Sequence, residues 1–591
     1  MDQPGNASEV FTTENRKSRF TSTLNCHPNI LTTKVPLHLV DENAARQIPR
    51  PARENAGLRN DVLLGKAEKL RETIHESRKA EAPRIIASHQ DDPPAGGNMS
   101  RIVQTSSRAG FVLILSCFGT FLLLLAPPMA SPRQPNPDAQ AAPDPRLQNA
   151  YKFQQGGWTY VHLEGSPEHI GFQHGFLLAR EIADAFEAIK LEDTHTTKRN
   201  WEFFRKAAHE MLWPKIDAEY QQELIGIVEG LKAQGVAMDI DDLVAVNAFE
   251  ELPGYYVPWF DQKEHVAGAP RLSSPGNCSA FIATGSYTRD HQIVIAHNNW
   301  TSYLVGSRWV IVFDIVPEHG NRILMDGFPG VITSDDDFGL NSAGIMVAET
   351  TIAQFVGWDP QGNPEFVRSR KALQYASSID DYARIIKDGN NGGYANDWLI
   401  GDRKTGEIGY LELGLKHTPM WRTKDGYFVS SNFARDPAVI KDETSGFDPT
   451  DVSNSPNARH MRWEQLIKQS KGKIDVSMAQ SFMADHLDSF EKKEQPDERS
   501  LCGHVDASSR GVSIWQWGPY YPGGAVQGKA TDSSLAERMS FQARAGHPCG
   551  QDFIAKDFLS AHPDYSWEAP VLRDMKSGPW TLFHSGQPAG Q

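Results

Sequence analysis

The chain is 591 residues long, enough for two or three domains of ordinary size or for one large two-layer domain with extensions. Its formal net charge of −15 gives a nucleic-acid partner no electrostatic support. The sequence has no helical or propeller repeat, phosphate-binding glycine loop, dinucleotide fingerprint, zinc-protease helix motif or Gly-x-Ser-x-Gly elbow. These features exclude the commonest nucleotide-dependent and serine-hydrolase classes.

The first 98 residues differ in composition from the rest. They carry many Asn, Arg, Glu and Pro residues with little apolar periodicity, which is typical of a disordered extension. A short basic segment, the apolar run 109–126 and small residues up to Ser131 follow, as in a secretory signal peptide. Because signal peptides stand at the N-terminus, we expect Met99 to be the true start and residues 1–98 to be an upstream misreading.

This interpretation makes the protein exported, either periplasmic or secreted. The alternative is a single membrane anchor, because the apolar run is near the minimum length that spans a bilayer. A linker rich in Pro, Ala and Asp then leads to about residue 148.

A predominantly helical region is predicted next. Ser166 is a candidate N-cap with Pro167 at the first helical position, and further helices are predicted at 220–234 and 241–252. His169 and His174 are five residues apart and have no third ligand nearby, so a metal site is not predicted there. The loop Pro258–Pro275 has the composition of an exposed processing site.

The stretch that follows, from Gly276, predicts a β-hairpin that begins at a cysteine. The β-rich runs 278–284 and 291–297 flank a polar turn. Symmetric closure about that turn places Cys278 opposite His297, with a register slip of one or two residues left open. Cysteine at the start of one strand, with histidine and asparagines at the far end of the other, suggests a nucleophile. Taken alone, a cysteine is more often a small buried hydrophobic residue.

Downstream, short β-rich runs alternate with amphipathic helices. The predicted strands include 308–316, 321–325 and 407–413, and the predicted helices 366–376 and 379–387. The run Asn390-Asn-Gly-Gly by itself indicates a tight turn. Asp335-Asp-Asp lacks the ligand spacing of a calcium loop and is expected to be a solvated turn.

Several of these stretches together resemble the phospholipase B-like proteins. The resemblance is carried by Gly276-Asn-Cys-Ser-Ala, Ala296-His-Asn-Asn-Trp300, Asn391-Gly-Gly-Tyr-x-Asn-x-Trp398, Ser455-Pro-Asn-Ala-Arg459 and Arg499-Ser-Leu-Cys-Gly-His504. They also resemble the wider group of autoproteolytic acyltransferases and acyl hydrolases that includes penicillin acyltransferase and bile salt hydrolase. Those enzymes are N-terminal-nucleophile hydrolases.

The resemblance implies a four-layer α/β/β/α sandwich of two stacked antiparallel sheets with helices outside. It also implies that the chain cuts itself between Asn277 and Cys278, and that the two pieces stay associated. The expected parts are the extension 1–98, the signal segment 99–130, the linker 131–148, a helical light chain or propeptide 149–277 and a catalytic heavy chain 278–591.

The resemblance, together with elementary chemistry, suggests roles for individual residues. An N-terminal Cys278 carries its own base, because a free α-amine has a pKa of about 7.7–8.0 and a thiol one of about 8.5. Asn396 is expected to donate to the oxyanion, and Arg459 to orient the cysteine and its amine. His297 and Asn299 are further candidate site residues.

Two more residues are assigned to substrate binding. Trp300 is expected to help line an apolar slot, and Asn341 is a second candidate donor to the oxyanion. The wider group has an aspartate near the end of the second hairpin strand, where this chain has His297, Asn298 and Asn299. That departure favours the phospholipase B-like branch over penicillin or bile-salt chemistry.

The expected activity is hydrolysis of an acyl ester or amide bond in a small-molecule lipid or N-acyl substrate, without metal or other cofactor. One alternative is an acyltransferase or amidase acting on N-acyl amides or penicillin-type substrates. Another is a thiol peptidase, although no papain-like Cys-Gly-Ser-Cys-Trp context surrounds Cys278. A third is a non-catalytic exported binding protein with the same fold.

The cysteine count gives a separate prediction. A form that begins at Ser131 keeps Cys278, Cys502 and Cys549, so one pair and one free nucleophile is the simplest arrangement in an oxidising compartment. We therefore predict a Cys502–Cys549 disulfide. The rival is a metal site formed by these two cysteines with His504 and His547.

Overall fold

The structure is a computed structural model that describes residues 144–266, 278–335 and 338–588, all within the unit that spans 131–591. The predicted extension, the signal segment, most of the linker and the scissile residue Asn277 lie outside the described residues. Among the residues that are described, no helix has the length and apolar character needed to cross a membrane.

The larger of the two main sheets has nine strands in the order β1-β2-β5-β6-β7-β8-β9-β10-β11. Neighbouring strands are antiparallel except β2 and β5, which are parallel. The strands are β1 Tyr151–Gln155, β2 Trp158–Gly165, β5 Ile311–Pro317, β6 Ile323–Gly327, β7 Gly339–Asn341, β8 Ile345–Thr351, β9 Asn396–Asp402, β10 Glu407–Leu413 and β11 Met420–Thr423.

The smaller sheet has six antiparallel strands in the order β12-β3-β4-β15-β16-β17. It contains the predicted hairpin as β3 and β4. The strands are β3 Ser279–Thr284, β4 Val294–Ser302, β12 Gly426–Ser430, β15 Gly523–Asp532, β16 Ser540–Ala545 and β17 Thr581–His584, and a separate short ribbon pairs β13 Leu487–Asp488 with β14 Lys493–Glu494.

Helices fill the connections between the strands. Those that precede Cys278 are α2 Pro167–Leu177, α3 Ala179–Thr197, α4 Trp201–Ala207, α5 Ala218–Ala233, α6 Ile240–Asn247 and α7 Val257–Lys263. The later ones are α8 Tyr303–Gly306, α9 Glu365–Tyr375, α10 Ile379–Lys387, α11 Pro437–Glu443, α12 Ser455–Gln469, α13 Val476–Met483, α14 Ser533–Glu537 and α15 Ala555–Ala561.

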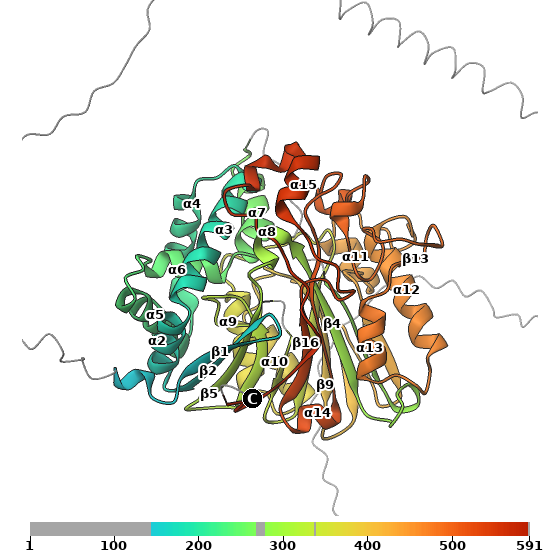
Figure 1. The fold of residues 1–591 in the computed structure, drawn as a ribbon, viewed down its shortest axis with the longest axis horizontal. Helices are drawn as coiled ribbons and strands as arrows, with labels where there is room; N and C mark the ends of the chain where they lie inside the picture. Colours follow the sequence, from blue (N-terminus) through green and yellow to red (C-terminus); the bar gives the residue numbers. More distant parts are fainter. Residues whose placement is uncertain (1–143, 267–277, 336–337, 589–591) are drawn as a thin grey trace, which may run out of the picture. The chain divides into compact units, whose positions relative to one another are not determined.

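The two sheets pack face to face, and helices cover their outer faces (Figure 1). Side chains alternate along a strand, so β3 buries Ala280 and Ile282 against the larger sheet. Its other face buries Phe281 and Ala283 against α12 and α13. The larger sheet packs its outer face on α2, α3, α5, α6, α9 and α10. These layers confirm the predicted α/β/β/α sandwich.

Helices α2 and α5 pack closely against each other, and this explains the glycines in the segment after Ser166. A Cβ atom added at Gly175 would stand 2.0 Å from the backbone oxygen of Ile227, so the two backbones touch where glycine leaves room. His174 on α2 is buried, and its Nε2 accepts a hydrogen bond of 3.1 Å from the Gly330 amide. This histidine therefore has a structural partner.

Local sequence signals are confirmed where they act within one element. Ser166 caps α2 and accepts from the His169 amide, with Pro167 at the first turn. Helix α10 begins and ends at the predicted residues. The region expected to be helical before Cys278 also contributes β1 and β2, which join the large sheet through the parallel β2–β5 pair. The segments before and after Cys278 therefore share one sheet.

Candidate active site

Cys278 immediately precedes β3, and the hairpin register differs by two residues from symmetric closure. The observed pairs are Ser279 with Asn298 and Ala280 with His297. A 3₁₀ turn and a residue with positive φ in the connection shift its centre along the chain. Continuing the register places Cys278 opposite Asn299, not opposite His297 as predicted. The Cys278 Sγ atom lies 4.0 Å from Asn299 Oδ1.

His297 and Asn299 are two residues apart on β4, so their side chains lie on the same face of the sheet whichever of them is opposite Cys278. The thiol of Cys278, the imidazole of His297 and the carboxylate of Glu349 have atoms that all lie within 4.8 Å of one another. All three side chains are buried. The structure therefore brings a thiol, an imidazole and a carboxylate together, from two different sheets.

Glu349 was not predicted, and neither was its hydrogen-bond donor Tyr394. The Tyr394 hydroxyl donates to Glu349 Oε1 over 3.0 Å. Burial and the charge of Glu349 raise the pKa of Tyr394 well above its ordinary value, so the phenol remains a neutral donor. A signal existed for Tyr394, which stands inside the Asn-Gly-Gly-Tyr run. Glu349 is an ordinary strand residue with no such signal.

Arg459 on α12 binds the backbone of Cys278. Its guanidinium donates to the Cys278 carbonyl over 2.8 Å, to Asn432 Oδ1 over 2.9 Å and to Ser455 Oγ over 3.0 Å. It also stacks 4.3 Å from the ring centre of Trp300. Burial lowers the pKa of Arg459 to about 9, which still leaves it charged at neutral pH.

Asn432 links this arginine to the larger sheet. Its Nδ2 donates to the carbonyl of Thr351 on β8 over 2.8 Å, while its Oδ1 accepts from Arg459. Thr351 is the cross-strand partner of Asn396. Asn432 thus connects Arg459 with the strand next to Asn396, the predicted oxyanion donor. No sequence motif indicated this connection.

Asn396 is completely buried at the start of β9. Because Thr351 faces Asn396 and Glu349 lies two residues before Thr351, Asn396 and Glu349 are diagonal neighbours on one face, about 7–8 Å apart. Neither polar atom of the Asn396 side chain has a hydrogen-bond partner among the described residues. A buried amide without a partner is costly, so one in this position is a candidate to bind a ligand.

Two predicted substrate-binding residues have structural roles. The side chain of Asn341 donates to the carbonyls of Leu373 and Ala376 at the end of α9 and accepts from the Ile345 amide, so it joins the β7–β8 turn to that helix. Trp300 is fully buried in a cluster with Trp515 and does not line the cavity described next. It supports the guanidinium of Arg459 instead.

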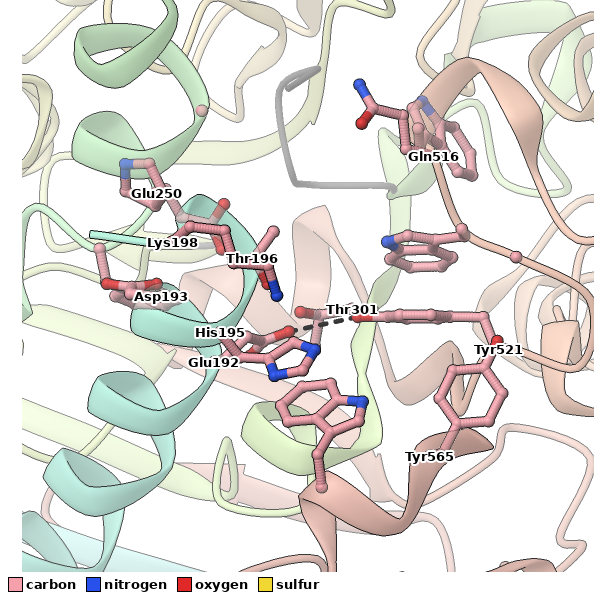
Figure 2. A pocket seen from close by; sticks show the side chains of 17 residues that line it. Glu192, Asp193, His195, Thr196, Lys198, Glu250, Thr301, Gln516, Tyr521 and Tyr565 are labelled. Carbon is pink, nitrogen blue, oxygen red and sulfur yellow. Dashed lines mark hydrogen bonds between the residues drawn. The ribbon is translucent and has the colours of Figure 1, made fainter. Parts of the chain in front are cut away.

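A cavity of about 350 Å³ lies close to the nucleophile's hairpin (Figure 2). Thr301 of β4 lines it, two residues beyond Asn299 on the same strand. Aromatic side chains form much of its wall: Phe249, Trp515, Trp517, Tyr521, Tyr565 and Trp567. Burial raises the pKa of the lining Glu192 to about 7, and the hydroxyls of Ser302 and Tyr521 donate to its carboxylate.

The two described cysteines outside this site, Cys502 and Cys549, are free thiols in the structure, which therefore lacks the predicted disulfide between them. They lie in a cluster with His486 and His504. His547, predicted as a ligand in the rival metal site, packs against His504 with ring centres 4.1 Å apart and the rings tilted by 33°. His486 takes its place in the cluster. Cys278, His297 and Glu349 are the other described group with the composition of a metal site.

The fold and this centre define a class: a two-sheet α/β sandwich with a buried thiol, imidazole and carboxylate at the start of a central hairpin. The family model described as Phospholipase B matches residues 185–411. This match places residues 185–411 among sequences similar to phospholipase B.

Individual relatives agree with this assignment. The chain is 32% identical to phospholipase B-like 2 of Mus musculus over 151 residues, and this alignment covers 23% of this chain and 25% of the mouse protein. It is 30% identical over 355 residues to phospholipase B-like 1 of Caenorhabditis elegans, covering 54% and 58%. An uncharacterized protein of Archaeoglobus fulgidus is 24% identical over 288 residues, covering 45% and 44%. The matches thus span between a quarter and three fifths of these relatives.

Proposed function

We propose that the chain is an acyl hydrolase that cuts itself before Cys278 and then uses this residue as an N-terminal nucleophile. The observation that carries the proposal is the environment of Cys278. Its thiol lies beside His297 and Glu349, and its carbonyl is held by the buried Arg459. Such convergence of a nucleophile, titratable groups and a fixed backbone is what acyl transfer requires.

Self-cleavage would supply the base. Hydrolysis of the Asn277–Cys278 amide frees the α-amine of Cys278, which then takes the thiol proton. The sulfur attacks the substrate carbonyl, an S–C bond forms, and the ester or amide bond breaks as the amine returns the proton to the leaving group. Water then attacks the thioester and releases the acyl group as an acid. His297 and Glu349 set the electrostatic field around these proton transfers.

The oxyanion of the tetrahedral intermediate needs a hydrogen-bond donor that is not already bonded to another group. The side-chain N–H of Asn396 meets this requirement, because it is buried, lacks a hydrogen-bond partner among the described residues and shares a face with Glu349. Asn299 Nδ2 is a second buried amide of this kind, and the Oδ1 atom of the same side chain lies 4.0 Å from the thiol.

The substrate class follows from the cavity and the family. The relatives are named for phospholipase B, and the aromatic wall of the cavity near Thr301 suits a hydrophobic acyl chain. One strand residue spans about 3.4 Å, so the cavity begins some 7 Å from the position of Asn299. We therefore place acyl esters or amides of lipids in it, with lysophospholipid-type and N-acyl-amide compounds foremost.

Processing and substrate use are tested together. Purified protein should contain a piece that begins at Cys278, which at 65.7 kDa per 591 residues weighs about 35 kDa for residues 278–591. N-terminal sequencing identifies the piece, and a panel of phospholipids, lysophospholipids, N-acyl amino acids and penicillin-type amides identifies the substrate. An acceptor amine added to the assay separates transferase from hydrolase. An intact chain that is active, or a processed chain inactive on the whole panel, would contradict the proposal.

Asn396→Ala should reduce kcat by about 100-fold to 1000-fold, because one oxyanion donor contributes about that much. Substrate KM should change little, since the hydrogen bond forms mainly with the developing negative charge. Asn341→Ala is the matched control: it removes two hydrogen bonds to the end of α9 and one within the β7–β8 turn, so it should lower Tm while the folded enzyme keeps its kcat. Steady-state kinetics and thermal unfolding of both variants check this, and equal kcat losses would refute the assigned role of Asn396.

A further inference from the structure

Four potential metal ligands converge outside the candidate active site. His486 follows α13, Cys502 and His504 precede β15, and Cys549 follows β16. One donor atom from each lies within 4.8 Å of the donor atoms of the other three. Cys502 and His504 are buried, and the other two are half-buried. Three chain segments that are distant in sequence therefore present two thiols and two imidazoles to one point.

The measured spacings fit a metal ion at that point. His504 Nε2 lies 3.5 Å from Cys502 Sγ and 3.6 Å from Cys549 Sγ. In a tetrahedral zinc site, Zn–S bonds of about 2.3 Å and Zn–N bonds of about 2.0–2.1 Å place sulfur and nitrogen about 3.6 Å apart. Both sulfur–nitrogen distances therefore match the edges of a zinc tetrahedron. Two cysteines and two histidines are also a common ligand set for structural zinc.

We propose that His486, Cys502, His504 and Cys549 form a structural site for one Zn²⁺ ion. The site is separate from the proposed acyl-transfer centre and does not depend on it. A zinc site also accounts for the two imidazoles beside the thiols, whereas a Cys502–Cys549 disulfide would not require them. Nε2 of His486 is shielded from solvent and has no nitrogen or oxygen partner among the described residues.

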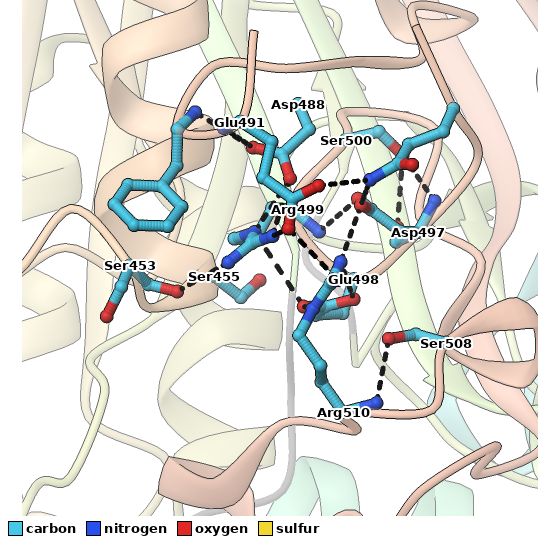
Figure 3. A network of polar contacts seen from close by, with 12 residues as sticks. Ser453, Ser455, Asp488, Glu491, Asp497, Glu498, Arg499, Ser500, Ser508 and Arg510 are labelled. Carbon is cyan, nitrogen blue, oxygen red and sulfur yellow. Dashed lines mark hydrogen bonds and ion pairs between the residues drawn. The ribbon is translucent and has the colours of Figure 1, made fainter. Parts of the chain in front are cut away.

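Backbone hydrogen bonds fix the segment that carries Cys502 and His504, as a preformed metal site requires. The Cys502 amide donates to the Asp485 carbonyl and the His504 amide to the Asp497 carbonyl, each over 3.0 Å. Figure 3 shows the ion-pair network around Arg499 that holds the same segment. Asp506 places a carboxyl group 4.0 Å from Nδ1 of His504, on the side of the ring away from the cysteines.

The same segment supports the nucleophile. The Leu501 carbonyl, next to Cys502, accepts from Asn298 over 3.0 Å and from the Trp300 indole over 3.3 Å. Gly503 packs so closely on Trp300 that a Cβ atom there would stand 2.0 Å from its ring. Trp300 in turn stacks on Arg459, which binds the Cys278 carbonyl. The zinc ion would therefore fix a loop that positions the catalytic hairpin.

Metal analysis of the full chain, purified without added metal and without a metal-chelating tag, tests the proposal. We expect about one zinc ion per chain, lost in Cys549→Ser and in His486→Ala. Cys278→Ser is the matched control and should keep its zinc, because it changes the other cysteine-containing cluster. X-ray absorption of the zinc-bound protein should show two sulfur and two nitrogen ligands, and the cobalt-substituted protein should show the visible bands of a tetrahedral thiolate site.

Several results would overturn the site. One is purified protein without metal, whether Cys502 and Cys549 are free thiols or are joined in non-reduced peptides by mass spectrometry. Another is zinc that is lost in Cys278→Ser but kept in Cys549→Ser, which would assign the ion to the nucleophile's cluster. If Cys549→Ser does not fold, the absorption spectrum of the unmutated protein decides, because a ligand set without two sulfur atoms excludes the site.

Discussion

The Cys278→Ala variant is expected to remain one uncut chain and to lose acyl-hydrolase activity by about 1000-fold or more, as when other covalent nucleophiles are removed. The thiol provides the attacking sulfur in both reactions, so a single substitution should stop both. The variant should still fold, because Arg459 binds the backbone carbonyl of residue 278, and alanine keeps that carbonyl.

Denaturing gels, N-terminal sequencing and assays on the best substrate measure the two losses. Circular dichroism and Tm show whether the variant is folded. Cys278→Ser is the informative companion, because a hydroxyl is a weaker nucleophile of similar shape and should slow both reactions without changing the fold. Hydrolysis at the original rate by the alanine variant would mean that Cys278 is not the nucleophile.

Arg459→Met is expected to show the second large effect, on stability and on processing together. It leaves the Cys278 carbonyl and Asn432 Oδ1 without their donor, and each buried acceptor left without a partner costs about 1–3 kcal/mol. Removing a buried cation relieves some desolvation, so we expect the free energy of unfolding to fall by a net of about 2 kcal/mol. The misplaced carbonyl of residue 278 should also slow self-cleavage.

Urea unfolding and the rate of appearance of the Cys278 N-terminus measure these two effects. Arg370→Met is the matched control, since Arg370 is equally buried but pairs with Glu223 at 3.1 Å on the helical side of the large sheet. It should destabilise the protein without slowing processing of the folded fraction. Processing at the unmutated rate in Arg459→Met would show that the arginine has only a structural role.

Much of the architecture could be predicted because it depends on short-range patterns. Ser166 and Pro167 specify the start of α2 through capping, and helix α10 follows from apolar residues at helical spacing. The alternating runs on either side of a polar turn predicted β3 and β4. These signals act within about ten residues, so they can be recognised without knowing what packs against the element. The family resemblance then supplied the four-layer arrangement.

The hairpin pattern suggested Cys278 as a candidate nucleophile, and the family resemblance favoured that interpretation over a buried hydrophobic residue. The sequence could not decide the hairpin register. A symmetric turn and one shifted by two residues place the same residues on the same face, so the hydrophobic pattern does not distinguish them. The geometry of the connection decided that Asn299, and not His297, lies opposite Cys278.

The tertiary structure alone decided which distant side chains meet. Glu349 joins Cys278 from the other sheet, and Asn432 joins Arg459 to the strand beside Asn396. His486, and not His547, joins the two thiols from a third segment, although the three segments have no shared period or motif. Each of these meetings depends on sheet order and on the packing of helices on sheets. Sequence periodicity reports which face a residue occupies, but it does not report what lies across from that face.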